Sequence, residues 1–266
     1  MLPANKALIL ALTLVSPLSI ADEWTTSSGL SVRDAHSTQP GAGYKDRGWS
    51  ANASMNKQLG DWSFGGALSY SLSTLDQDTN SARKTPKSLS GVAMASRDIG
   101  DGRSVSATLG YGSSVANSSE VTGGNTITYS SDSNFLSTSV GLSQSLSLSR
   151  RSMAIVSARY THVRSTQKSY TTSAGTSIPE SNSGFGFTTL GVGYNHRFGR
   201  FTPYIQADWN VSNRAFIDTD KHYATINTGI NYRVNATTNV GVSLSTVVNK
   251  AYSRDNSLGV SVSHAF

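Results

Sequence analysis

The chain has 266 residues, of which 14% are charged and 37% apolar, with a net charge of +6 and no cysteine. The charged fraction is well below the roughly one quarter usual in soluble domains, and the lack of cysteine excludes disulfides and thiolate metal sites. The Lys and Arg residues are scattered, without a basic run or an aromatic RNA-binding motif, so nucleic acid is not expected as a partner.

The N-terminal segment has the three parts of a secretory signal peptide. Lys6 supplies the positive region, residues 7–18 form a short apolar run, and Ser19-Ile20-Ala21 offers a small-x-small cleavage site. The apolar run is too short to span a bilayer comfortably. We therefore expect a signal peptide over residues 1–21, cleaved after export, and a single domain over residues 22–266.

Downstream of this segment, apolar residues alternate with small or polar residues. In residues 61–75, DWSFGGALSYSLSTL, every second residue is apolar, aromatic or glycine, and the residues between are almost all Ser, Gly or Ala. A period of two predicts β-strands with one apolar face. Because the second face is small and nearly uncharged, the pattern is typical of a transmembrane β-barrel with lipid outside and a wet lumen inside.

The same alternation predicts about twelve strands, each near the length that a tilted membrane strand needs. They are expected at residues 24–34, 45–58, 61–75, 87–98, 103–116, 133–147, 152–165, 185–198, 201–212, 221–234, 239–250 and 256–266. Short turns alternate with longer polar connections, notably 117–132 and 166–184, as between the two ends of an up-and-down barrel. The fold class is therefore all-β, an antiparallel up-and-down transmembrane barrel.

The alternation also assigns the direction of side chains. Apolar sets such as Leu190, Val192 and Tyr194 are expected to face outward, and aromatic residues near strand ends are expected to form two interfacial girdles. The segment 87–98 is ambiguous, because Val92 and Met94 fall out of phase with Leu89.

Charged residues assigned to the lumen are the candidate site. They are Arg33, Arg159, Arg197, Asp208 and Arg233. An excess of guanidinium groups would favour anions in an open pore, whereas pairing of these groups with Asp208 would brace a narrow barrel. The sequence leaves both alternatives open.

Catalytic and metal motifs are not found. None of the five histidines lies in a His-Glu-x-x-His motif, and there is no Gly-x-Ser-x-Gly elbow. The segment DQDTN at 76–80 opens like a calcium loop, but the required Gly and Glu are replaced by Ser81 and Lys87. No catalytic residue, metal site or cofactor is predicted.

Two segments resemble the β-domains of autotransporters. They are GYNHRFGRFTPYIQADW at 193–209 and the closing strand RDNSLGVSVSHAF at 254–266. The resemblance implies an outer-membrane location and recognition of the last strand, with Leu258, Val260, Val262 and Phe266, by the barrel-assembly machinery. Residues 24–34 are expected to form a strand, so we expect the passenger and pore helix of that family to be lacking.

These observations predict an integral outer-membrane barrel of autotransporter β-domain type in a Gram-negative envelope, with membrane lipid as its surroundings. Its expected role is that of a passive pore or of a structural and surface-display protein. A surface hydrolase, phospholipase or protease, on the same barrel is the alternative. A soluble β-sandwich lectin or adhesin is disfavoured by the uncharged second face and by the alternating connection lengths. The oligomeric state is not predicted.

Overall fold

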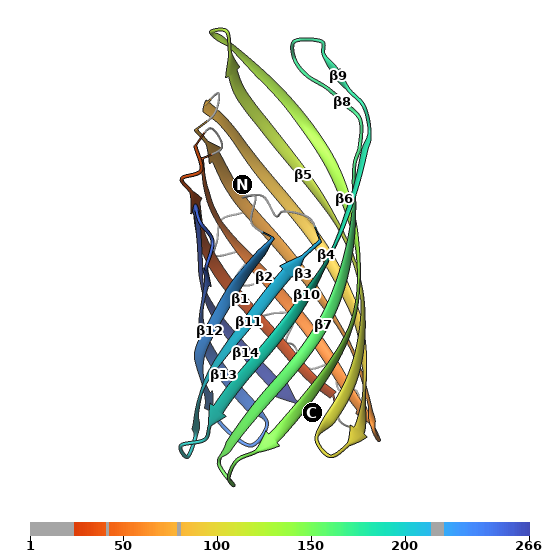
Figure 1. The fold of residues 1–266 in the computed structure, drawn as a ribbon, viewed down its shortest axis with the longest axis vertical. Coiled ribbons are helices and arrows are strands. Elements are labelled where there is room, and N and C mark those ends of the chain that lie inside the picture. Colours follow the sequence, from red (N-terminus) through yellow and green to blue (C-terminus); the bar gives the residue numbers. More distant parts are fainter. Residues whose placement is uncertain (1–23, 41–42, 79–80, 214–220) are drawn as a thin grey trace.

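The computed structural model describes residues 24–40, 43–78, 81–213 and 221–266, and these residues form a closed antiparallel β-barrel (Figure 1). The predicted signal peptide, residues 1–21, lies outside the described residues. The strands are β1 (Trp24–Ser37), β2 (Tyr44–Leu59), β3 (Trp62–Gln77), β4 (Ala82–Gly100), β5 (Arg103–Thr122), β6 (Asn125–Ser147), β7 (Ser152–Gln167), β8 (Tyr170–Thr171), β9 (Ser177–Ile178), β10 (Ser181–His196), β11 (Phe201–Ser212), β12 (His222–Arg233), β13 (Thr238–Val248) and β14 (Ser253–Ala265).

Twelve of these strands make up the wall, as predicted. Their order around the barrel follows the chain, and β1 closes the sheet against β14. The short strands β8 and β9 form a separate hairpin between β7 and β10. Closure gives every wall strand two neighbours, so the backbone N–H and C=O groups are paired within the sheet. Within the described residues, no helix is long and apolar enough to cross a membrane.

The two ends of the barrel differ in their connections. At one end, here called the turn end, the strands are joined through residues 60–61, 101–102, 148–151, 197–200 and 234–237. The first residues of β1 and the last residues of β14 both lie at this end, since Thr25 pairs with Ala265. The other end, here called the loop end, carries the longer connections and the β8–β9 hairpin, which projects beyond most of the wall (Figure 1).

The outer wall carries the apolar residues that the alternation assigned to it. Leu190 lies beside Trp209 and Ala158 on neighbouring strands, and both Leu190 and Val192 are more than half exposed. Aromatic residues gather near both ends: Trp62, Phe64, Phe198, Phe201 and Phe266 at the turn end, and Trp49, Tyr70, Tyr160 and Trp209 towards the loop end. An apolar band between aromatic girdles is the surface of a membrane barrel.

The expected connection at 117–132 is wrong, because β5 and β6 continue as a hairpin to a two-residue turn at Gly123 and Gly124. The sequence of this extension does not sustain an alternation between apolar and polar residues, so only the backbone pairing of the two strands reveals it. Both of its turn residues have positive φ, 59° and 80°, which glycine adopts without strain.

The segment 87–98, whose facing the sequence left ambiguous, lies within β4, and the register of β4 assigns its side chains. Leu89 faces outward, and Val92 and Met94 face the lumen, opposite Ala67 and Gly65 of β3. Each of the two occupies space left by a glycine: a Cβ on Gly110 would lie 3.3 Å from Val92 Cγ2, and one on Gly65 would lie 3.3 Å from Met94 Cγ. Apolar side chains are therefore accepted on the inner wall where a neighbouring glycine makes room.

Candidate functional site: the inner wall of the barrel

Small hydroxyl and amide side chains cover most of the inner wall and bind one another between adjacent strands. The pairs are Ser27–Ser54 (2.6 Å), Ser31–Ser50 (2.7 Å), Ser88–Ser114 (2.9 Å), Ser104–Ser143 (2.7 Å), Thr189–Asn210 (2.7 Å) and Thr108–Ser139. Since each pair joins neighbouring strands, these side chains lie along the wall rather than across the lumen. Most of the lining is therefore made of short polar groups, with larger side chains such as Phe135 and Tyr204 lying over the glycines opposite them, Gly112 and Gly229.

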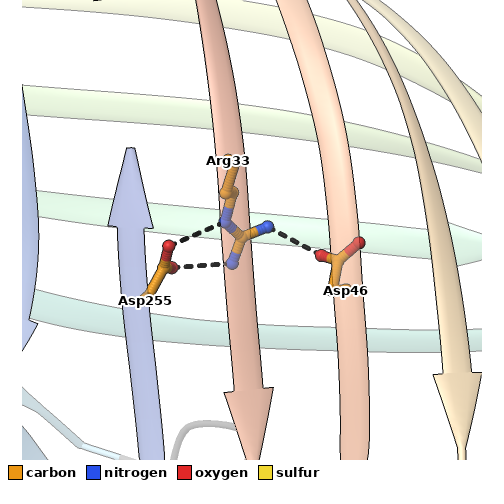
Figure 2. Close-up of polar contacts among 3 residues, drawn as sticks. All are labelled: Arg33, Asp46 and Asp255. Carbon is orange, nitrogen blue, oxygen red and sulfur yellow. Dashed lines mark hydrogen bonds and ion pairs between the residues drawn. The ribbon is translucent and has the colours of Figure 1, made fainter. Parts of the chain in front are cut away.

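Arg33 holds the closing seam of the barrel together at the loop end. Its Nε and Nη2 donate to the two carboxylate oxygens of Asp255 on β14, at 3.0 and 2.7 Å, and its Nη1 donates to Asp46 Oδ2 on β2 at 2.9 Å. Figure 2 shows the guanidinium on β1 between the two carboxylates, so that one side chain spans three neighbouring strands. Gly48 lies directly opposite Arg33 and adds no side chain there.

Arg159 and Asp208 lie on either side of β10, on the inner wall in the middle of the barrel. Arg159 on β7 pairs with Thr189 of β10, and Asp208 on β11 pairs with Gly191, the next inward position of β10. Asp208 accepts hydrogen bonds from Gln206 Nε2 at 2.9 Å to each oxygen. Within the described part of the chain Arg159 forms no ion pair, and the residue is exposed.

Arg197 and Arg233 lie at the turn end. Arg233 is the last residue of β12, opposite Asn239, and Arg197 follows directly after β10, where its backbone N–H donates to Arg151 O at 2.8 Å. The four arginines therefore occupy three levels of the barrel rather than a single ring: Arg33 near the loop end, Arg159 in the middle, and Arg197 with Arg233 at the turn end.

The sequence did not single out Asp46 and Asp255, the two partners of Arg33. Both were visible as inward positions, because Asp46 is in phase with Gly48 and Ser50, and Asp255 is in phase with Ser257. The sequence alone did not reveal that β14 pairs with β1, which brings together residues 222 positions apart.

A hydrolytic site is not assembled around the histidines of the described residues. His162 faces outward beside Gly186 and Thr138, with no hydrogen bond to a serine or a carboxylate in the described part of the chain. His196 Nδ1 lies 2.7 Å from Ser152 Oγ at the turn end, but no carboxylate completes the pair there. No group of three His, Asp or Glu residues able to hold a metal ion is found among the described residues.

The terminal strand lies in the wall with its apolar face outward. Leu258, Val260 and Val262 face Val32, Leu30 and Ser28 of β1, and Phe266 donates its backbone N–H to Trp24 O at 2.9 Å. The last strand thus closes the barrel along its full length, beside the strand that begins it.

The fold is shared with solved outer-membrane barrels. The structure matches the translocator domain of autotransporter NalP from Neisseria meningitidis with a TM-score of 0.83 at 15% identity, covering 99% of this chain and 95% of that one. It matches the beta domain of the Bordetella autotransporter BrkA with a TM-score of 0.73 at 14% identity, over 92% and 100% of the two chains. The toluene transporter TodX of Pseudomonas putida is more distant, with a TM-score of 0.51 at 13% identity, over 98% and 93%.

No curated protein sequence matches the chain. The model of the family described as "Autotransporter beta-domain" matches residues 24–245, which is most of the barrel. The resemblance predicted from residues 193–209 and 254–266 is thereby confirmed. The chain belongs to the autotransporter beta-domain family of outer-membrane β-barrels.

Proposed function

We propose that this barrel acts as a passive, water-filled pore across the outer membrane. The observation that supports the proposal is the inner wall, where short hydroxyl and amide groups bind their neighbours on adjacent strands. A lining of this kind is polar enough to hold water and too short to fill a wide lumen.

The strand number supports the same function. Twelve strands spaced about 4.8 Å apart and tilted by about 40° place opposite Cα atoms about 24 Å apart. Barrels of about eight strands are just wide enough for side chains to fill. Serine and glycine on the inner wall of a twelve-strand barrel leave more space than larger side chains would.

The charges of the lumen favour anions in this proposal. In the middle section the charges of Arg159 and Asp208 offset each other, so the net positive charge comes from Arg197 and Arg233 at the turn end. Arg33 contributes little, because Asp46 and Asp255 compensate its charge. A positive field at the mouth of a wet pore raises the local anion concentration.

The test is the conductance of the purified full chain in a planar lipid bilayer, with two variants on strand β10. Gly193 faces the lumen and Gly184 faces outward, and a Cβ at either position meets only ordinary contacts of 3.5 Å or more. We expect stepwise currents from the native protein, smaller steps from Gly193→Trp, and native steps from Gly184→Trp. An absence of steps, or equal effects of the two variants, would contradict the pore.

The loop end supports a second candidate function, surface display. The β8–β9 hairpin is fastened to the extension of β6: the rings of Tyr129 and Tyr170 stack at 5.0 Å, and the Thr128 and Ser173 segments exchange hydrogen bonds of 2.8 and 2.9 Å. A projection fixed in this way presents a rigid surface outside the membrane. Binding of external ligands that is lost on deleting residues 169–179, with conductance unchanged, would identify this function.

We further propose that the barrel has no hydrolase activity. The proposal is supported by the lack of a serine, histidine and carboxylate arrangement among the described residues. Lipid and peptide hydrolysis measured on the sample used for conductance tests it, and turnover by the native protein that Ser152→Ala abolishes would contradict it.

A further inference from the structure

The outer wall contains a groove of about 910 Å³ across the closing seam. It crosses β2, β1, β14, β13 and β12, and its lining is dominated by two adjacent rows of outward positions. The row nearer the turn end is Val32, Leu258, Leu244 and Thr228, and the row nearer the loop end is Arg47, Asp34, Asn256, Thr246 and Ile226. The volume lies within the roughly 300–1,000 Å³ typical of small-molecule sites.

The end of the groove formed by β2 and β1 lies at the edge of the apolar band. Val32, in the lower row, is aligned with Trp49 on β2, and Trp49 contacts Tyr70 in the loop-end girdle. Tryptophan and tyrosine girdles mark the boundary between hydrocarbon and headgroups. The next outward row, with Asp34 and Arg47, lies about 7 Å further along the strands. Because the strands are tilted, each row descends from β2 towards β12: Trp49 is ten residues from Leu59, the turn-end residue of β2, whereas Thr228 is five residues from Arg233, the turn-end residue of β12. The Arg47 end of the groove therefore contacts headgroups, and the Thr228 end contacts acyl chains.

The upper row is polar and partly paired. Arg47 Nε donates to Asp34 Oδ1 at 2.9 Å, and Thr246 Oγ1 donates to Asn256 Oδ1 at 2.7 Å. The Arg47 side chain is 66% exposed, and its terminal Nη groups form no hydrogen bond within the described residues. Two donors in a planar fork are thus left without a partner on an exposed side chain, and a guanidinium fork suits a phosphate.

Charged residues on the loop-end side of the groove also favour an anion. Lys45, His36 and Arg254 occupy the next outward row on β2, β1 and β14, aligned with one another. Lys45 and Arg254 are exposed. With Arg47 they make three permanent cations, against the carboxylate of Asp34, which Arg47 pairs, and that of Asp76 beside Lys45 on β3, which Arg83 pairs at 3.6 Å. The Arg47 end of the groove is complementary to an anion.

We propose that this groove binds one phosphate-bearing membrane lipid, with an acyl chain at the Thr228 end and the phosphate on Arg47, assisted by Lys45 and Arg254. The occupant follows from the position of the groove, since a lipid-facing wall is covered by lipid, and from the positive charge at its headgroup end. This site lies on the outside of the barrel and does not depend on the proposed pore.

The test is native mass spectrometry of the delipidated full chain in detergent, titrated with dipalmitoyl phosphatidic acid or with dipalmitoylglycerol, which has the same chains without the phosphate. We expect one phosphatidic acid to bind in preference to dipalmitoylglycerol. Arg47→Gln is expected to weaken phosphatidic acid binding about tenfold, as the loss of one good charge-assisted contact would. Thr228→Trp, which fills the lower row, is expected to weaken the binding of both lipids.

Arg83→Gln is the matched control. Arg83 is also an exposed outward arginine near the loop end, paired with Asp76 at 3.6 Å, but it lies outside the groove. Equal loss of affinity in Arg83→Gln and Arg47→Gln would mean general electrostatic adsorption and would overturn the proposal. Equal binding of the two lipids, or a second copy of the protein in place of a lipid, would overturn it as well. Retention of the folded band on an unheated gel shows that each variant has formed its barrel.

Discussion

Replacing Arg33 with methionine tests whether the closing seam depends on one guanidinium. The substitution retains much of the side-chain volume but removes three hydrogen bonds and leaves Asp46 and Asp255 on the lumen wall without a cation. We expect the barrel to become easier to unfold while its native topology is retained, because the backbone ladder between β1 and β14 is unchanged.

The size of the effect follows from burial. The Arg33 side chain is 47% exposed, but the carboxylates of Asp46 and Asp255 are only 14% and 30% exposed. Removing one partner of a buried ion pair costs about 3–5 kcal/mol, whereas an exposed pair contributes about 0.2–1 kcal/mol. An intermediate site with three charge-assisted bonds is therefore expected to lose about 2 kcal/mol of unfolding free energy.

The assay is reversible urea unfolding in detergent or lipid vesicles, followed by the gel mobility of the folded barrel and by tryptophan fluorescence. Arg83→Met is the control, since its pair with Asp76 is 3.6 Å long and both side chains are about 60% exposed or more; we expect a change below about 0.5 kcal/mol. Asp255→Asn, alone and combined with Arg33→Met, completes a double-mutant cycle. Equal losses in Arg33→Met and Arg83→Met, or additive effects in the cycle, would refute the role of this seam contact.

Three further predictions address closure, assembly and lumen charge. The mature chain is expected to run faster on a denaturing gel before boiling than after it, because a closed barrel has no edge from which to unfold; identical mobility together with solubility without detergent would contradict the membrane barrel. Phe266→Ser is expected to lower outer-membrane assembly more than Tyr204→Ser, an inward position, as measured by the heat-modifiable fraction in isolated membranes; equal losses would remove the terminal aromatic as a signal. Arg159→Ser is expected to reduce the anion preference in reversal potentials under a salt gradient, most strongly at low salt where screening is weak, with Arg83→Ser as the outer-wall control; an unchanged potential would remove Arg159 from the ion path.

The wall of the barrel could be predicted from the sequence because lipid imposes a local rule. Each strand that crosses the apolar band must place an apolar side chain at every second position, and that period is visible in segments such as Val105, Ala107 and Leu109 without knowledge of any partner. Strand number, side-chain direction and the contrast between turn end and loop end followed from this rule. The extension of β5 and β6 beyond residue 116 was not predicted, because its sequence does not sustain this alternation.

The candidate sites required the closed sheet. Arg33 and Asp255 are neighbours only because β14 pairs with β1, and Arg159 and Asp208 share one part of the inner wall only because β10 pairs with both of their strands, at Thr189 and Gly191. The outer groove combines rows from five strands whose sequences show no common motif. The alternation of a single strand determines which face a residue occupies, because that depends on the local period of two. Only the register of neighbouring strands decides which residues on that face meet, because it is fixed by the closure of the whole barrel.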